Sequence, residues 1–162
     1  MAVRGREAGK PILVLVADLE MATSVSREPG PEVRRLAERF WPGALTLVLP
    51  ARDGLPAPLT AGSGTIGVRV PAHATARALV AGLGGPVTAP SANPPGAEPP
   101  RTLAAARAYF GDAVAVYVDG GVLPGGASTV ASVKGGTLHV LRAGPVRESA
   151  LRAALDEEPW RS

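Results

Sequence analysis

Pro11-Ile12-Leu13-Val14-Leu15-Val16-Ala17 is the stretch from which the fold can be worked out. It is an unbroken apolar run of strand length, and it ends at Asp18 without a cleavage signature. Such a run is typical of a strand covered on both faces, as in a sheet flanked by helices. It therefore predicts a buried strand near the start of an α/β fold and argues against a signal peptide.

Helices and further strands alternate along the rest of the chain. Apolar periodicity, Pro31, the capping residue Thr102 and glycine stops predict four helices, over residues 32–41, 73–83, 103–110 and 147–155. A short strand at Val87 and five longer ones are predicted, over residues 44–49, 65–70, 115–119, 129–133 and 138–142. Gly135-Gly136 is expected to turn the last two strands into a hairpin. The pattern predicts an α/β (α+β) fold with a single-layer, twisted, mixed, open sheet flanked by helices.

Composition sets the limits of the function. The 162 residues fit one domain, expected over residues 1–156 with a frayed tail at 157–162, and no stretch approaches the ~20 apolar residues of a membrane span. The chain has no cysteine, which excludes disulfides, thiolate catalysis and zinc–thiolate sites, and its two histidines are too few for a metal cluster. The net charge is +3, and 15 of the 17 basic residues are arginine. Arginine suits phosphate and carboxylate ligands, but high genomic GC content gives the same bias.

The most informative polar segment is Val87-Thr88-Ala89-Pro90-Ser91-Ala92-Asn93-Pro94-Pro95-Gly96. It runs from a short strand into hydroxyl and amide groups held by a Pro- and Gly-rich turn. Ser91 and Asn93 could present hydrogen-bonding groups to a small ligand at a strand end. The same residues are ordinary turn formers, so a plain loop stays open as the alternative.

Four further segments could bind an anion. Arg4, Arg6 and Lys10 lie just before the buried strand, where cations suit a polyphosphate unless this end is simply solvated. Thr65, Gly67 and Arg69 share one face of their strand, either lining a cavity or facing water at an edge. The third is the glycine turn Gly125-Gly126-Ala127-Ser128-Thr129-Val130, which places Ser128 and Thr129 at the start of a strand. The fourth is Leu141-Arg142-Ala143-Gly144-Pro145, in which an arginine lies at a strand end.

Taken in order, these segments resemble the motifs of the YrdC-like family of threonylcarbamoyl-adenylate synthases. Arg4-Gly5-Arg6 with Lys10 resembles the Lys-x-Arg motif, and Phe40-Trp41-Pro42-Gly43-Ala44-Leu45-Thr46 resembles the Trp-Pro-Gly block with its threonine. Gly67-Val68-Arg69-Val70-Pro71 resembles the arginine-bearing strand. The other matches are Ser91-Ala92-Asn93, Ser128-Thr129-Val130 and Leu141-Arg142-Ala143-Gly144. The resemblance covers roughly residues 3–147, and the order and spacing carry more weight than any single motif.

The resemblance implies an activity. Family members join L-threonine, bicarbonate and ATP, accompanied by Mg²⁺, into threonylcarbamoyl-AMP and pyrophosphate, the activated donor for threonylcarbamoyladenosine in tRNA. The resemblance implies no prosthetic group and no resident catalytic base. Family members also present a positively charged concave face, described as binding double-stranded RNA. The implied partners are therefore tRNA or double-stranded RNA and the machinery that transfers the threonylcarbamoyl group, in the cytoplasm.

The resemblance also implies residue roles. The residues implied to contact ATP are Arg4, Arg6, Lys10, Thr65, Ser91, Asn93 and Arg142. The residues implied to contact threonine are Arg69, Ala89 and Ser128. No catalytic side chain is expected, because a carbamate is already anionic and the reaction then rests on positioning and on neutralising charge.

Two departures from the family pattern leave a second function open. Arg4 stands where the family has lysine, and the chain shows no match to the Pro-Thr-rich segment that family members carry before this motif. A shortened sheet would expose an edge, which a homodimer would cover. The alternative is therefore a non-catalytic nucleotide- or double-stranded-RNA-binding relative of the YrdC or YciO type.

Overall fold

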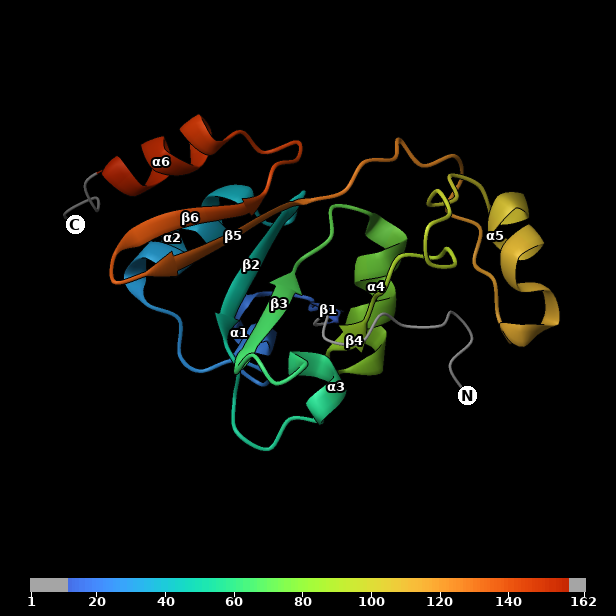
Figure 1. Cartoon of the computed structure of the whole chain (residues 1–162), viewed down its shortest axis with the longest axis horizontal. Coiled ribbons are helices and arrows are strands. Elements are labelled where there is room, and N and C mark those ends of the chain that lie inside the picture. The colour runs from blue at the N-terminus through green and yellow to red at the C-terminus, as the bar shows by residue number, and fades with distance from the viewer. Residues whose placement is uncertain (1–11, 158–162) are drawn as a thin grey trace.

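The computed structural model describes residues 12–157, which form a six-stranded mixed sheet with helices beside it (Figure 1). The strand order across the sheet is β4-β1-β3-β2-β5-β6. The strands are β1 (Leu13–Leu15), β2 (Leu45–Pro50), β3 (Thr65–Arg69), β4 (Val87–Thr88), β5 (Thr129–Lys134) and β6 (Thr137–Arg142). β1 runs parallel to β3 and β2 runs parallel to β5, whereas the pairs β1–β4, β2–β3 and β5–β6 are antiparallel. The predicted class, a mixed open sheet flanked by helices, is confirmed.

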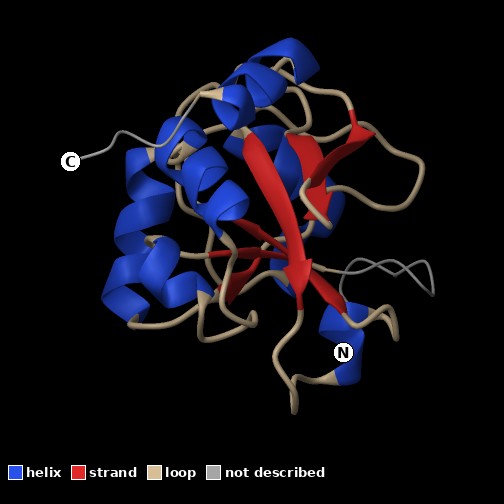
Figure 2. Cartoon of the chain, turned by 90° about the vertical axis from the view of Figure 1, so that its left-hand side faces the viewer, coloured by secondary structure: helices blue, strands red, loops and turns tan. Residues whose placement is uncertain are grey.

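One face of the sheet is covered by α2 (Pro31–Phe40) and α6 (Glu148–Asp156), which pack against each other and against β2, β5 and β6. The strands turn alternate residues toward these helices, because successive side chains on a strand point to opposite faces. The buried residues on this face include Leu36 and Leu151 from the helices and Leu45, Leu47, Leu49, Ile66 and Val68 from the strands. Figure 2 shows the helices gathered against the strands.

The opposite face of the central strands is polar. On β2 and β3 the residues that alternate with the helix-facing ones are Thr46 and Val48, then Thr65, Gly67 and Arg69. The predicted shared face of Thr65, Gly67 and Arg69 is confirmed by the alternating burial of β3. The expectation that the first strand is covered on both faces holds only in part. Val14 is buried on the helix-covered side, whereas Leu13 and Leu15 are half-buried on the other.

Two further helices lie at the β4 end of the molecule (Figure 1). They are α4 (Ala74–Leu83) and α5 (Leu103–Phe110), and the 3₁₀ turn η1 (Gly111–Ala113) follows directly on α5. Both helices match their predicted bounds within a residue, and Thr102 caps α5 by accepting a hydrogen bond from the backbone N–H of Ala105. Two short helices were not predicted, α1 (Leu19–Ala22) and α3 (Ala57–Thr60).

The predicted strand over residues 115–119 is wrong. This segment pairs with no strand of the sheet, and Val116 and Val118 are 74% and 53% exposed. Tyr117 attaches the segment to α5 instead, since its hydroxyl donates to the carbonyl of Gly111 at 2.8 Å and its ring lies 5.1 Å below the Arg107 guanidinium. Alternation of apolar residues identifies an extended segment, but a strand also needs a neighbour to receive its hydrogen bonds.

Candidate functional site

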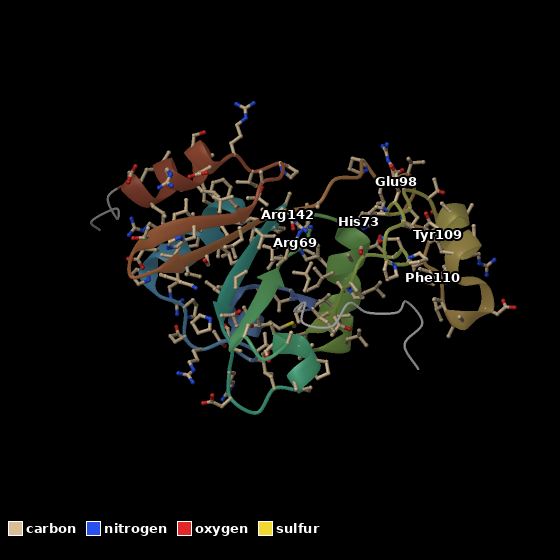
Figure 3. The ribbon with its side chains drawn as sticks, in the orientation of Figure 1. Arg69, His73, Glu98, Tyr109, Phe110 and Arg142 are labelled. Carbon is tan, nitrogen blue, oxygen red and sulfur yellow. The ribbon has the colours of Figure 1, made fainter. Side chains whose placement is uncertain are left out.

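Three of the predicted site residues gather at one edge of the sheet. The pairing directions bring the ends of β3 and β6 beside the beginnings of β2 and β5. Arg69 ends β3, Arg142 ends β6, and Ser128 directly precedes β5. Figure 3 shows the side chains of Arg69 and Arg142 next to each other above the central strands. The topology therefore brings together motifs that lie up to 73 residues apart, since 142 minus 69 is 73.

Arg69 is held by the loop that contains the Trp-Pro-Gly block. Its Nε donates to the carbonyl oxygen of Gly43 at 2.7 Å, and the backbone N–H of Gly43 donates to the carbonyl of Val70 at 2.9 Å. The Trp41–Pro42 peptide bond in this loop is cis, and the Trp41 indole N–H donates to the carbonyl of Leu45 at 2.8 Å. The block thus fixes the direction of one guanidinium, whose two Nη nitrogens donate to no protein acceptor within residues 12–157.

Arg142 is held by the turn before β5. Its Nε and Nη2 donate to the carbonyl oxygen of Ser128 at 3.1 and 2.9 Å, and Nη2 also lies 3.2 Å from the Ser128 hydroxyl. Gly144 makes this approach feasible. A Cβ at position 144 would lie 2.7 Å from both the Ala127 carbonyl oxygen and the Ser128 carbonyl carbon, distances that side chains do not tolerate. The terminal Leu-Arg-x-Gly motif therefore has a steric reason for its glycine.

The charge at this edge is unbalanced. Burial lowers the pKa of the Arg69 guanidinium from its ordinary value, and the positive charge of Arg142 lowers it further. Within residues 12–157, no Asp or Glu forms an ion pair with either arginine. Two neighbouring guanidinium groups without a carboxylate favour an anionic ligand, because an anion would remove their mutual repulsion and accept their N–H groups.

Thr65 is separated from this cluster by the length of β3. It opens the strand that Arg69 ends, four residues or roughly 13 Å away. Its hydroxyl lies 2.9 Å from the Ser63 hydroxyl. Between the two ends, Gly67 has no side chain to project from this face of the sheet. Thr65 and Arg69 therefore face the same side but could reach only different parts of one extended ligand.

The Ser-Ala-Asn loop follows β4, the strand at one edge of the sheet. Ala89 is half-buried and its backbone N–H donates to the carbonyl of Leu13 at 2.8 Å, which attaches the loop to β1. Asn93 is buried, and its Nδ2 donates to the carbonyls of Pro94 and Ala97 at 3.0 and 2.7 Å. Ser91 is exposed. Asn93 thus holds its own loop in shape, and none of the hydrogen bonds above joins this loop to Arg69 or Arg142.

The three cations near the start of the chain, which were predicted to bind ATP, lie outside the described residues. Arg4, Arg6 and Lys10 precede residue 12, where the described residues begin. Their assignment to ATP stays a prediction.

Sequence reasoning did not give a role to Thr46, which lies at the centre of the cluster. Thr46 is 4% exposed, and its hydroxyl lies 2.7 Å from the hydroxyl of Ser128, which is 5% exposed. The signal was present, since the Trp-Pro-Gly block ends with this threonine, but the contact spans 82 residues of sequence and depends on the pairing of β2 with β5.

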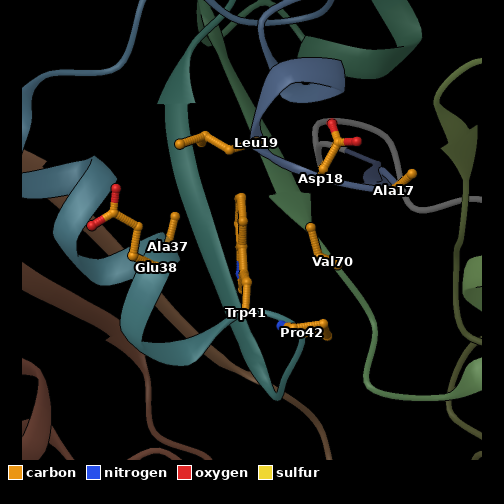
Figure 4. A pocket seen from close by; sticks show the side chains of 8 residues that line it. All are labelled: Ala17, Asp18, Leu19, Ala37, Glu38, Trp41, Pro42 and Val70. Atoms are coloured by element: carbon orange, nitrogen blue, oxygen red, sulfur yellow. The ribbon is translucent and has the colours of Figure 1, made fainter.

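A separate cavity of about 300 Å³ lies on the helix-covered side of the sheet (Figure 4). Its lining residues are Ala17, Asp18, Leu19, Ala37, Glu38, Trp41, Pro42 and Val70. It is mainly apolar, its charged groups are carboxylates, and Val70 points to the face opposite Arg69. It is therefore unsuited to the anion that the arginine pair favours.

From residue 12 to residue 157, no three His, Asp or Glu side chains are grouped so that they could hold a metal ion. In the same range, no helix has the length and apolar character needed to cross a membrane.

The architecture defines a class of protein: an α/β protein with an open mixed sheet, one face packed by helices and one edge carrying a cationic, hydroxyl-containing site. The chain belongs to the Sua5/YciO/YrdC family, since the family model described as "Telomere recombination" matches residues 1–144. This confirms the resemblance seen in the motifs.

Relatives and solved structures agree with this assignment. The chain is 34% identical to a threonylcarbamoyl-AMP synthase of Bacillus subtilis over 94% of its own length, and 35% identical to a putative threonylcarbamoyl-AMP synthase of Mycobacterium tuberculosis over 96%. The crystal structure of Pyrococcus abyssi Sua5 complexed with L-threonine matches 96% of the chain with a TM-score of 0.89 at 33% identity. The chain spans 44% of the Bacillus protein, 71% of the Mycobacterium protein and 46% of the Pyrococcus chain.

Proposed function

We propose that this protein forms threonylcarbamoyl-AMP and pyrophosphate from L-threonine, bicarbonate and Mg·ATP. The observation that carries the proposal is the pair of arginines, Arg69 and Arg142, gathered with Ser128 at one sheet edge without a compensating carboxylate among residues 12–157. The names of its relatives and the threonine complex of a structural neighbour support the same reaction and favour it over a non-catalytic relative.

The chemistry suits a site of hydrogen-bond donors. The threonine amine and bicarbonate form a carbamate with loss of water, and a carbamate oxygen attacks the α-phosphorus of ATP. The bond from that phosphorus to the bridging oxygen breaks, and pyrophosphate leaves with the electron pair. Because the nucleophile is already an anion, the protein contributes mainly positioning and neutralisation of charge. Arginine and hydroxyl side chains can supply both.

We assign the residues as follows. Arg69 and Ser128 hold threonine together with the loop at Ala89, and Arg142 contacts the phosphates. The other residues proposed for ATP are Arg4, Arg6, Lys10, Thr65, Ser91 and Asn93. The contact between Arg142 and Ser128 supports this division, because it would place the two substrates side by side.

The product implies its own consumer. A mixed carboxylic–phosphoric anhydride hydrolyses readily, so it must pass to an enzyme that transfers the threonylcarbamoyl group to tRNA. We place this exchange in the cytoplasm. Contact with tRNA or double-stranded RNA, and a homodimer, stay predictions.

The test is pyrophosphate release measured with all three substrates and with each omitted in turn. We expect release to require both threonine and bicarbonate. In parallel, Ser91→Ala and Arg6→Ala should each weaken ATP binding by about 1–3 kcal/mol. Release that ignores threonine would contradict the proposed reaction, and unchanged ATP affinity in both variants would contradict the nucleotide site.

A further inference from the structure

The hydroxyl groups of Thr46 and Ser128 form one unit. They lie 2.7 Å apart, both residues are nearly fully buried, and Ser128 also receives the Arg142 guanidinium on its carbonyl oxygen and its hydroxyl. Thr46 comes from β2 and Ser128 from the turn before β5, and the parallel register of these strands sets their distance. Among the described residues, Thr46 forms no hydrogen bond with Arg69 or Arg142.

A count of protons shows what this unit offers. Each hydroxyl has one hydrogen to donate, and a guanidinium can only donate. Whichever hydroxyl donates in the Thr46–Ser128 bond, one hydrogen of the pair is left, and residues 12–157 supply no further acceptor for it. The positive charge of Arg142 prevents that hydrogen from turning toward the guanidinium. The pair therefore has one O–H donor to give to a ligand.

The shape around Thr46 fixes the arrangement. Thr46 Cγ2 points at Gly67 of the neighbouring strand, where an added Cβ would lie 3.4 Å from it. With its methyl group on one side, Thr46 turns its hydroxyl to Ser128 on the other. Threonine has a restricted χ1 torsion because it is branched at Cβ, so the donor is oriented before a ligand arrives.

We propose that Thr46 is a positioning residue. Its hydroxyl donates to the Ser128 hydroxyl, so that the Ser128 O–H donates to an anionic oxygen of the substrate beside Arg69 and Arg142. With both acceptor positions of Ser128 Oγ taken by Thr46 and Arg142, its own hydrogen can only point into the site. This inference rests on the proposed function for its substrate, but its geometry requires only an oxyanion.

The experiment is a double-mutant cycle of Thr46→Val and Ser128→Ala in the full chain. Pyrophosphate release gives kcat and KM for threonine, and calorimetry gives the Kd of inorganic pyrophosphate. Valine keeps the shape of threonine and removes the hydroxyl. We expect Thr46→Val to lower kcat/KM about tenfold, Ser128→Ala to lower it by at least as much, and the double variant to be no worse than Ser128→Ala alone.

Two further variants separate positioning from stability. Thr46→Ser restores the hydroxyl and should recover most of the activity, although a merely structural threonine would lose its methyl contacts in this variant. Gly67→Ala brings a methyl group into van der Waals contact with the Thr46 methyl and leaves the hydroxyl, so it should lower kcat/KM less than Thr46→Val does. If Thr46→Val does not fold, Thr46→Ser decides the question against wild type: near wild-type kcat/KM supports the role of the hydroxyl, and a loss as large as that of Ser128→Ala overturns it.

The outcomes distinguish the inference from the proposed function. An active wild type with an unaffected, folded Thr46→Val, or losses that multiply in the double variant, would overturn the role of Thr46 and leave the function intact. A wild type without turnover that still binds pyrophosphate, with the non-additive pattern in Kd, would overturn the function and keep the role. A wild type that neither turns over nor binds pyrophosphate would overturn both.

Discussion

The two faces of the central strands differ in what their side chains do, although alternate residues of the same strands form both. Leu45, Leu47 and Leu49 of β2 point toward α2 and α6 and are buried, whereas Thr46 between them points to the open face and joins the arginine site. One face supplies stability, and we propose that the other supplies donors to a ligand. Substitutions one position apart should therefore have separable effects.

The largest effect is expected from Leu47→Ala. Leu47 is buried opposite Val68 and Ala131, and removing its side chain leaves a cavity in the core. We expect the free energy of unfolding to fall by about 2–5 kcal/mol in urea denaturation. Val48→Ala, on the open face of the same strand, is the matched control. Equal losses in the two variants would break the distinction between the faces.

The next effect concerns Gly144, which belongs to neither face. It lets the chain after β6 come close to residues 127–129 before β5 and at its start. Gly144→Ala would push residues 127–129 away from the chain after β6. We expect about 1–3 kcal/mol of destabilisation, with weaker pyrophosphate binding because Arg142 loses its hold on Ser128. Gly82→Ala, inside α4 and without atoms within 4 Å of the added Cβ, should instead stabilise the protein slightly. A harmless Gly144→Ala would show that the turn can relax.

A smaller effect is expected from pyrophosphate itself. Burial lowers the pKa of Arg69 and repulsion by Arg142 lowers it further, and an anion would offset both effects, so it should stabilise the fold. At ten times its Kd the gain is about 1.4 kcal/mol, seen as a rise in melting temperature over sodium chloride of equal ionic strength. Arg69→Met should abolish the shift. Arg152→Met should not, since Arg152 pairs with Glu148 on the exposed side of α6. A shift that survives Arg69→Met would place the anion elsewhere.

The sequence was most informative where a pattern has one cause. Alternation along residues 65–70 assigned Thr65, Gly67 and Arg69 to one face, because burial of every second residue leaves that trace. Thr102 marked the start of α5 through the chemistry of its side chain. Motif order found Arg69, Ser128 and Arg142, although the reason for their motifs appears only with the register. Thr46 could not be given a role, because its partner lies 82 residues away and only strand pairing brings them together.

The smallest expected effect tests the segment that alternation placed wrongly. Val116 is 74% exposed and faces neither the core nor the site, so Val116→Ser should change the free energy of unfolding by less than about 0.5 kcal/mol. Tyr117→Leu, at the next position, should lower the free energy of unfolding by more, because it removes the hydrogen bond from the tyrosine hydroxyl to the carbonyl of Gly111 at 2.8 Å. The pair is measured by urea denaturation under the same conditions. If Val116→Ser were the more costly of the two, the segment would be packed against a surface after all, and alternation would have been the better guide there.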